Sequence, residues 1–379
     1  TGLDAEPLSL KLGTIWTETD VSPDAWYLHA GRMPAGIMIE SGQADLMLIS
    51  YLGVDTENRS ERVYRLLGCT LTYHGGLPAI GETLCYDIHL DGHAKQGGTR
   101  LMFFHYDCHI AGKLRLSVCK GQAGFFTDAE LANSDGCIWR PEDQKIVENP
   151  RLDPPSARTP HNSFSPEQVV AFAEGRPWDC FGEPWVMAKP HTRTPRISAG
   201  RMLFLDQIDR FEVRGGPWDR GYLSASTAVT PDHWFFAGHF HNDPCMPGTL
   251  MFEGCLQAMA FFLAGLGYTI GHDGWRFEPV EGEPFVLSCR GQVTPKSKAL
   301  RYEVFVEEVI AGPIPILYAD LLCTVDGLKA FHARRVGLRL VPAWPLDEGN
   351  KLLEGYSEPG PVARAGEFPF DYRSMLACA

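Results

Sequence analysis

Three side chains that could carry proton chemistry, His239, Asp243 and Glu253, lie within one stretch of the sequence, residues 234–268. An imidazole ring can take up or release a proton near neutral pH. A carboxyl group in a dry environment is driven toward its neutral form and can then donate or orient a proton. His239 and Glu253 are therefore candidates for the base and the acid of a general acid–base reaction.

A buried helix must position the acid of this stretch. Residues 250–266 are apolar on nearly every helical face, with Glu253 as the one acid, which predicts a helix buried all round. A buried carboxyl group is costly without a partner, so we expect an imidazole from the preceding loop to meet it. The first backbone N–H groups of this helix, at Gly248 and Thr249, have no acceptor within the helix and are candidate donors for a carbonyl oxygen.

The same pattern occurs twice in the chain. Residues 23–28 resemble 231–236, and residues 33–40 resemble 246–253, so that Glu40 corresponds to Glu253. The two acids follow their Met at the same spacing, but the Trp-to-Met distance is 7 residues in the first copy (33 − 26) and 12 in the second (246 − 234). The first copy has lost five residues of the loop that carries the histidine. His29, near the shortened loop, does not align with His239, and we expect it to be structural.

Both copies of the helix are accompanied by extended segments. Runs rich in β-branched and aromatic residues, several bounded by turn-forming glycines, predict strands that must wrap the apolar helix, an α+β pattern. The expected strands are residues 62–73, 82–90, 99–110 and 114–126 in the first half and residues 202–211, 222–229, 284–293, 300–310, 315–325 and 330–340 in the second.

The chain divides into four parts by this reading. Residues 1–145 form the first copy, which lacks the histidine loop, and residues 196–345 form the second. The proline-rich residues 146–195 are a linker, with one short helix predicted where Ser165 supplies the N-cap and Pro166 the first helical position. Residues 346–379 are a polar tail. Because the first residue is Thr rather than Met, we expect a piece of a longer polypeptide.

Charge and composition exclude several classes of protein. The chain has 379 residues and a net charge of −13, which argues against nucleic-acid binding. The apolar helix is interrupted by polar residues, so no membrane span is expected. The eleven cysteines are an odd number without a Cys-x-x-Cys pair, which indicates reduced thiols and a cytoplasmic location. Two local basic clusters are either solvated surface or docking patches for an acidic carrier protein: Lys189, Arg193, Arg196 and Arg201, and Arg334, Arg335 and Arg339.

A metal site is the competing interpretation of His239, His241 and Asp243, because His-x-His-x-Asp resembles a zinc motif of metallo-β-lactamases. The sequence offers no second group of ligands and no Gly-rich phosphate loop after a strand, so we expect neither a metal nor a nucleotide cofactor. Asp243, followed by Pro244, is instead expected to shape the loop. Gln257, one turn after the helix acid, either bridges a water near the site or bonds the backbone.

The motif as a whole resembles a known family. His239-Phe240, Asp243-Pro244, Met246-Pro247-Gly248, Glu253 and Gln257 resemble the signature of the bacterial hotdog-fold β-hydroxyacyl-thioester dehydratases, including the branch that also isomerises the new double bond. In that family the histidine and the helix acid are the catalytic pair. The isomerising branch usually has Asp where this chain has Glu253, so movement of the double bond stays an open alternative. The resemblance covers about 35 residues and implies a double hotdog, as in the tandem dehydratase domains of polyunsaturated fatty acid synthases.

The resemblance also implies how the two halves cooperate. In such dimers each site joins the histidine of one hotdog to the acid of the other, so His239 should meet Glu40, while Glu253 faces the shortened loop. The open alternatives are that Glu40 only bonds in the core and that Glu253 is the partner. The implied substrate is a (3R)-3-hydroxyacyl chain on an acyl carrier protein, the product a trans-2-enoyl thioester, and the partners are other synthase domains and a second copy of the chain. A hotdog thioesterase and a non-catalytic scaffold that binds carrier protein remain the competing functions.

Overall fold

The computed structural model describes residues 2–59, 61–343, 363–365 and 368–370. The chain forms two compact units, Thr1–Val341 and Pro342–Ala379. In the second unit β14 (Ala363–Ala365) pairs antiparallel with β15 (Phe368–Phe370). The rest of the expected tail, residues 346–362, 366–367 and 371–379, lies outside the described residues.

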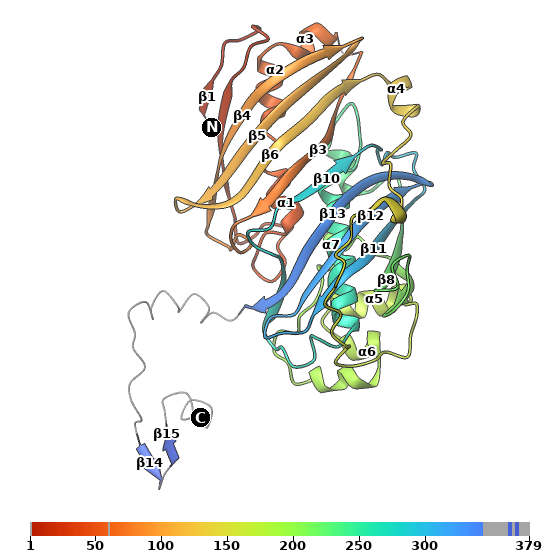
Figure 1. The fold of residues 1–379 in the computed structure, drawn as a ribbon. Helices are drawn as coiled ribbons and strands as arrows, with labels where there is room; N and C mark the ends of the chain where they lie inside the picture. Colours follow the sequence, from red (N-terminus) through yellow and green to blue (C-terminus); the bar gives the residue numbers. More distant parts are fainter. Residues whose placement is uncertain (1, 60, 344–362, 366–367, 371–379) are drawn as a thin grey trace. The chain divides into compact units, whose positions relative to one another are not determined.

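The first unit contains two halves with the same order of elements (Figure 1). The first half consists of β1 (Gly2–Asp4), β2 (Thr14–Asp20), α1 (Ala35–Glu40), α2 (Asp45–Tyr51), α3 (Val54–Asn58), β3 (Val63–Tyr73), β4 (Thr83–Gln96), β5 (Thr99–Ile110) and β6 (Lys113–Phe126). The second half consists of β7 (Gln207–Glu212), β8 (Tyr222–Ala228), η4 (Trp234–Ala237), α7 (Gly248–Gly265), β9 (Trp275–Pro279), β10 (Phe285–Cys289), β11 (Ala299–Ile310), β12 (Ile316–Val325) and β13 (Leu328–Pro342). Every strand expected in the sequence is present, and β1, β2 and β9 are additional.

One continuous antiparallel sheet runs through both halves. Its order is β1-β2-β4-β5-β6-β3-β10-β13-β12-β11-β8-β7, with β9 beside β13. The order reads the same from both ends when β3 is matched with β10 and β6 with β13, so the halves are related by an internal two-fold axis through the β3–β10 pair. Residues alternate between buried and half-buried along β5, as expected when one face of a sheet covers a core. The double hotdog expected from the sequence is confirmed.

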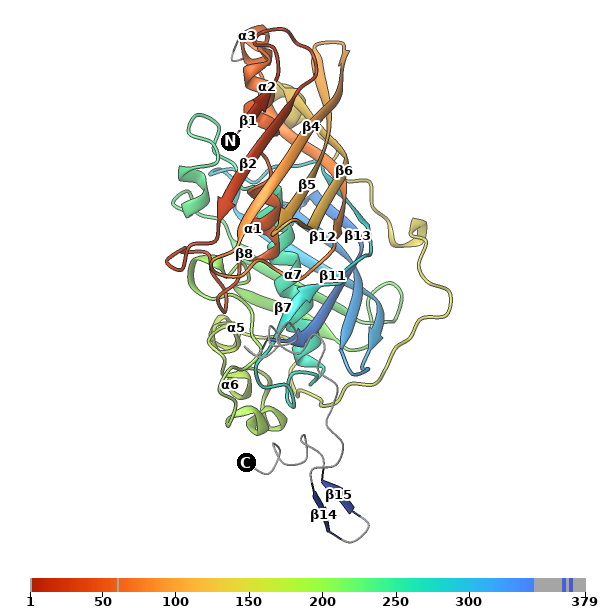
Figure 2. The same cartoon turned by 90° about the vertical axis from the view of Figure 1, so that its left-hand side faces the viewer.

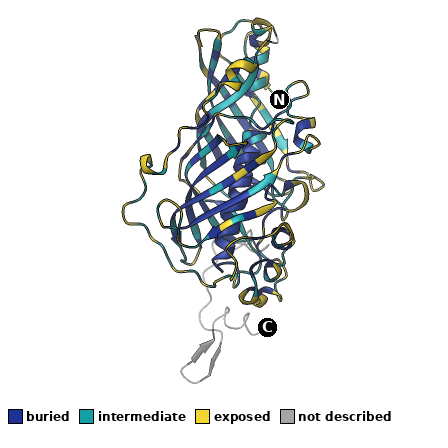
Figure 3. Cartoon of the chain, turned by 90° about the vertical axis from the view of Figure 1, so that its right-hand side faces the viewer, coloured by how far each residue is buried: buried dark blue, intermediate teal, exposed yellow. Residues whose placement is uncertain are grey.

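Helix α7 packs against the concave face of the part of the sheet that belongs to the second half. It begins after Pro247, whose extended backbone forms the N-cap, and all but its first residue are buried. Its length and composition would suit a membrane span, yet 94% of it is buried inside the protein, as for the core helix of a globular domain (Figure 3). A Cβ atom at Gly254 would lie 2.5 Å from the ring of Tyr302. The helix can therefore approach the sheet closely only with glycine at this position.

The helix of the first half is broken, which the sequence did not lead us to expect. Helix α1 ends at Glu40 and the chain turns before α2 begins. Two tyrosines of the sheet bond the carbonyls at the break: the Tyr86 hydroxyl donates to the Met38 carbonyl at 2.6 Å, and the Tyr106 hydroxyl donates to the Ile39 carbonyl at 3.2 Å. These bonds satisfy carbonyl groups at the end of the helix. The break leaves Glu40 at the end of α1.

Helices α1 and α7 lie side by side at the two-fold axis (Figure 2). A Cβ atom at Gly36 would lie 2.4 Å from the Thr249 carbonyl oxygen, so this glycine permits the close approach. On the same interface Trp26 and Trp234, which correspond in the repeat, contact edge to face with ring centroids 4.5 Å apart. The first turn of each helix therefore lies against the other half of the chain.

The segment expected to be a linker packs into the second half. It contains α5 (Pro166–Ala173), α6 (Pro177–Phe181) and η2 (Glu183–Ala188). Before it lie α4 (Asp128–Ala132) and η1 (Pro141–Asp143), and after it lies η3 (Gly200–Met202). Helix α5 is the short helix expected after Ser165, and it has a capping box. Phe172 and Phe181 meet Phe261 of α7, and the Trp185 indole donates to the Ala264 carbonyl at 3.1 Å. Its aromatic side chains therefore close the open end of the core around α7.

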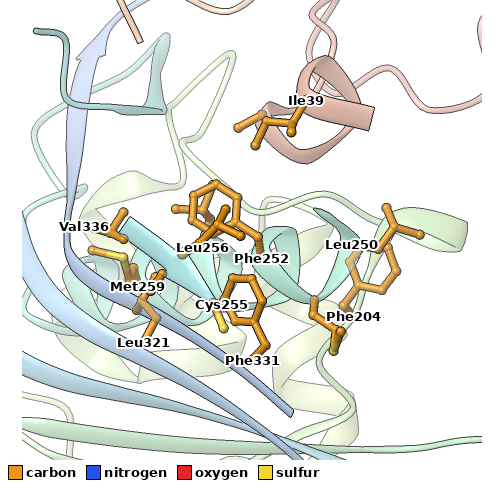
Figure 4. Close-up of a cluster of buried hydrophobic side chains, with 14 of the residues drawn as sticks. Ile39, Phe204, Leu250, Phe252, Cys255, Leu256, Met259, Leu321, Phe331 and Val336 are labelled. Atoms are coloured by element: carbon orange, nitrogen blue, oxygen red, sulfur yellow. The ribbon is translucent and has the colours of Figure 1, made fainter. Parts of the chain in front are cut away.

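The core between α7 and its sheet is apolar and contiguous. Figure 4 shows Phe252, Cys255 and Met259 of α7 close to Leu321 and Phe331 of the strands. These side chains are at most 1% exposed, and burial of each aliphatic or aromatic side chain of this size stabilises the fold by roughly 1.5–3 kcal/mol. This packing fixes the direction in which the start of α7 points.

Candidate active site

His239 and Glu40 come together across the two halves of the chain. The imidazole Nε2 lies 3.6 Å from Glu40 Oε1, and the side chains are 26% and 29% exposed. Glu40 is the last residue of α1, and His239 lies in the loop between η4 and α7. At this distance each side chain can contact a bound molecule, and the two side chains still interact electrostatically with each other.

The backbone fixes which ring nitrogen of His239 is free. Nδ1 lies 2.9 Å from the Cys245 carbonyl oxygen. A carbonyl can only accept, so Nδ1 must carry the hydrogen, and in the neutral ring Nε2 has the free lone pair. The Cys245 N–H in turn donates to the His239 carbonyl at 2.7 Å. This ring of contacts aims the basic nitrogen at Glu40 and the adjacent cavity.

The start of α7 holds the acid. The Thr249 hydroxyl donates to Glu40 Oε2 at 2.7 Å, which leaves Oε1 toward His239. Gly248 and Thr249 both line the cavity beside His239, and their backbone N–H groups make no hydrogen bond within the part of the chain that the structure describes. A free pair of N–H groups at the positive end of a helix is suited to a carbonyl oxygen that gains negative charge.

The cavity at this pair has walls from both halves and a volume of about 200 Å³. Leu46, Tyr64 and Leu66 contribute from the first half, and Phe240 and Met251 from the second. Such a mixture of apolar walls and a few polar groups is typical of a small-molecule site.

Arg65 is a site residue that the sequence analysis missed. Its guanidinium donates to both carboxylate oxygens of Asp243, with Nη2 2.8 Å from Oδ1. Its Nε also donates to the side-chain oxygen of Gln292 at 2.9 Å. Arg65 belongs to β3 of the first half, 178 residues from Asp243, so no local pattern could have revealed it. Asp243 shapes the histidine loop as expected, but it does so through an ion pair with the other half. His241 is exposed on the same loop.

Glu253 lies at a different cavity from His239. Its Oε2 accepts from the Gly36 N–H at 2.9 Å, and it is 7% exposed. Burial is the main cause that raises the pKa of Glu253 above its ordinary value. The structure therefore does not bring Glu253 to His239, and of the two acids named in the sequence analysis only Glu40 is adjacent.

Gln257 is also absent from the His239 cavity. Its amide donates to the Met202 carbonyl at 2.6 Å and accepts from the Phe204 N–H at 3.0 Å. Of its two expected roles, the structure shows the backbone bonds. His29 lines the cavity of Glu253, and its Nε2 lies 3.1 Å from the Arg196 carbonyl oxygen. Burial lowers the pKa of His29 to about 4, so this ring is neutral at physiological pH.

The two basic clusters differ. Arg334 is bound to Glu307 and Asp320, Arg335 to Glu308, and Arg339 to Glu281. These arginines are engaged by acids of the same sheet, which leaves little net charge for an acidic partner. In the other cluster Lys189, Arg193, Arg196 and Arg201 are all exposed.

Part of the chain matches the model of a known family. The family model of the FabA-like domain matches residues 197–334. These residues include His239, Asp243, the start of α7, Glu253 and Gln257.

The second half of the chain is thus similar to the FabA-like domain.

One component of the polyunsaturated fatty acid synthase of Thraustochytrium sp. is 34% identical over 315 residues, which are 81% of this chain. The chain spans about a fifth of that curated relative, 21% of its length. The match is longer than the FabA-like domain, so it includes part of the first half.

Solved structures with similar folds include a dehydratase domain from the CurJ module of the curacin polyketide synthase, at 10% identity and a TM-score of 0.44, covering 90% of this chain and 96% of that one. An oleoyl thioesterase of Lactobacillus plantarum has 11% identity and a TM-score of 0.46, covering 88% of this chain and 99% of that one.

Proposed function

We propose that the chain dehydrates 3-hydroxyacyl thioesters, with His239 and Glu40 as its catalytic pair. The observation that carries this proposal is the placement of the free Nε2 of His239 3.6 Å from Glu40 Oε1, across the two halves, at a cavity with free N–H groups. The similarity of residues 197–334 to the FabA-like domain supports it. Glu253 has no part in this reaction.

The reaction needs three groups, and the cavity supplies each of them. The thioester carbonyl oxygen binds to the N–H groups of Gly248 and Thr249, which stabilises negative charge as C2 loses its proton. His239 Nε2 takes that proton while the protonated carboxyl of Glu40 donates one to the departing C3 hydroxyl. The C3–O bond breaks, the C2–C3 double bond forms and water leaves. Return of the proton from His239 to Glu40, directly or through one water, restores the starting state.

The carrier of the substrate is part of the proposal. We infer a pantetheine-linked acyl chain on an acyl carrier protein, within a larger synthase, because the relative in Thraustochytrium sp. is a component of a polyunsaturated fatty acid synthase and is about four times as long as this chain. A trans-2-enoyl product is expected, and shift of its double bond to the 3 position is the finer possibility to be tested. A homodimer of double hotdogs and a cytoplasmic location stay predictions from the sequence.

A single incubation separates the candidate functions. The intact chain is mixed with a (3R)-3-hydroxyacyl pantetheine thioester, and enoyl-thioester absorbance and free thiol are followed together. Dehydration predicts growth of enoyl absorbance without thiol release. Thiol release without enoyl product would indicate a thioesterase, and binding without either signal would indicate a scaffold; both results would contradict the proposal.

A further inference from the structure

A second cavity lies between the halves, in the position that the internal two-fold axis relates to the proposed active site. The proposed active site is bounded by the loop before α7 and the acid of α1, and the second cavity is bounded by the loop before α1 and Glu253 of α7. Its walls are apolar, formed by Met33, Leu256, Ala260 and Phe277 among others. Its volume of about 60 Å³ admits a shorter apolar group than the active-site cavity does.

Two polar groups converge inside this cavity. Ser198 is 5% exposed, lines the cavity, and its hydroxyl has no hydrogen-bond partner among the residues that the structure describes. The Glu253 carboxyl lines the same space and is held in place by the Gly36 N–H. Burial raises the pKa of Glu253 above its ordinary value. The Ser198 hydroxyl, which faces the cavity, is free to donate to a ligand oxygen there.

The rim of the cavity is positively charged. Arg196 lines the rim and is exposed, and its guanidinium has no ion-pair partner in the described part of the chain. Lys189, Arg193 and Arg201 lie close to it in the sequence and are also exposed. A guanidinium at the mouth of an apolar cavity is suited to a phosphate or another anionic group.

The cavity lacks the base that dehydration needs. The shortened loop brings no counterpart of His239, and His29 is a weak base because its pKa is lowered to about 4. An acyl group bound here would therefore meet the Ser198 hydroxyl as a donor for its carbonyl oxygen but no imidazole base for its C2 proton.

We propose that this second cavity binds the acyl group of a phosphopantetheine thioester without transforming it. The thioester carbonyl oxygen accepts from the Ser198 hydroxyl, the first carbons of the acyl chain lie along α7, and the phosphate reaches Arg196. The choice of a thioester rests on the proposed function, whereas the donors and the apolar walls do not. One chain then holds two acyl groups, one in each half of the two-fold arrangement.

The test is the binding stoichiometry of butyryl phosphopantetheine, which has no 3-hydroxyl group and cannot be dehydrated. Equilibrium dialysis with the intact chain is expected to give two equivalents. The Ser198→Ala, Arg196→Gln double variant should bind the second equivalent about tenfold or more weakly, because it loses one hydrogen bond and one charge-assisted contact. The matched control is Arg201→Gln, which removes an exposed arginine of the same cluster and should retain both equivalents.

Two further measurements keep the outcomes distinct. Ala260→Leu, which fills the cavity with an apolar group, should also abolish the second equivalent. The double variant should dehydrate a 3-hydroxyacyl thioester at the wild-type rate, since neither residue belongs to the proposed catalytic machinery. The proposal would be overturned if the wild-type chain bound one equivalent and the variants bound the same. It would also be overturned if the variants still bound two equivalents. Loss of an equivalent in the variants, with no dehydration by any protein, would support this cavity and contradict the proposed function.

Discussion

The two cavities at the centre of this chain are built from the same elements and differ mainly in one loop. At the first, the full-length loop before α7 brings His239 to within 3.6 Å of Glu40. At the second, the loop is five residues shorter, and Glu253 bonds a backbone N–H at 2.9 Å instead. Each acid thus faces the loop of the opposite half. The comparison teaches that duplication followed by a small deletion can leave one reactive pair in a symmetric scaffold.

The comparison also shows what the half without a histidine loop contributes. The first half supplies Glu40, the cavity wall at Tyr64, and Arg65, which holds the histidine loop through Asp243. The second half supplies His239 and the N–H groups at the start of α7. Neither half alone contains the complete set of groups that the proposed reaction needs.

Removal of the imidazole should have the largest effect. His239→Ala is expected to reduce kcat for dehydration by about 10²–10⁴, the usual contribution of a general base. His241→Ala is the matched control, because His241 lies on the same loop and is exposed, and it should retain the wild-type rate. Equal losses in the two variants would mean that the loop tolerates no change and would leave His239 without a specific role.

The second largest effect is expected from loss of the clamp, the ion pair between Arg65 of the first half and Asp243 of the second. Arg65→Met is expected to lower kcat about 10–100-fold, because small displacements of a catalytic group are costly and Asp243 would lose its charged partner. Arg62→Met is the control, since Arg62 pairs with Glu130 instead.

A double variant decides whether the clamp acts as a unit. If Arg65 works through Asp243, adding Asp243→Asn to Arg65→Met should cost much less than the product of the two single effects. Independent, multiplying effects would contradict a shared role in holding the loop.

The buried acid of the first half should influence stability rather than turnover. Asp45 is 1% exposed, Tyr64 donates to it at 2.9 Å, and burial raises its pKa to about 7 from 3.8. Between pH 4 and pH 7 the folded state therefore binds a proton that the unfolded state lacks. The free energy of unfolding contributed by this site falls as pH rises through that window and stays low above it.

Asp45→Asn removes this pH dependence. The variant should gain about 4 kcal/mol in free energy of unfolding over wild type at pH 8, and little at pH 4, as measured by urea denaturation. Asp55→Asn, at an exposed position of neighbouring α3, is the control and should be neutral at both pH values. A gain that did not change with pH would contradict a protonated Asp45.

The smallest effect is expected at the hydroxyl that holds Glu40. Thr249→Val removes the 2.7 Å hydrogen bond to Glu40 Oε2 and should lower kcat about fivefold, which is roughly 1 kcal/mol. Thr249→Ser keeps a hydroxyl and should stay near the wild-type rate. A full rate in the valine variant would show that Glu40 needs no such support.

Much of this architecture was predictable from the sequence, for identifiable reasons. The strands follow from runs of β-branched and aromatic residues, and α7 from an apolar segment that begins after Pro247. The approach of His239 to Glu40 followed from the repeat and from the expected exchange of acids between halves. These are patterns within a few tens of residues or between two aligned copies.

The remainder depends on contacts between distant residues. Tyr86 and Tyr106 bond the carbonyls at the end of the first helix from strands 48 and 67 residues away, and no pattern in the helix itself predicts these contacts. Arg65 is one arginine in an ordinary strand until Asp243 is placed beside it. The proline-rich middle segment has no alternation of its own, so its packing against α7 is set by the aromatic surface that it covers.

The central claim is that one carboxyl, from the half without the histidine loop, works with His239. Its most direct test is kcat for dehydration of a 3-hydroxyacyl thioester by Glu40→Gln and Glu253→Gln, measured side by side. The account predicts a loss of about 10²–10⁴ for Glu40→Gln and a near wild-type rate for Glu253→Gln. Loss of turnover in Glu253→Gln with full activity in Glu40→Gln would contradict it.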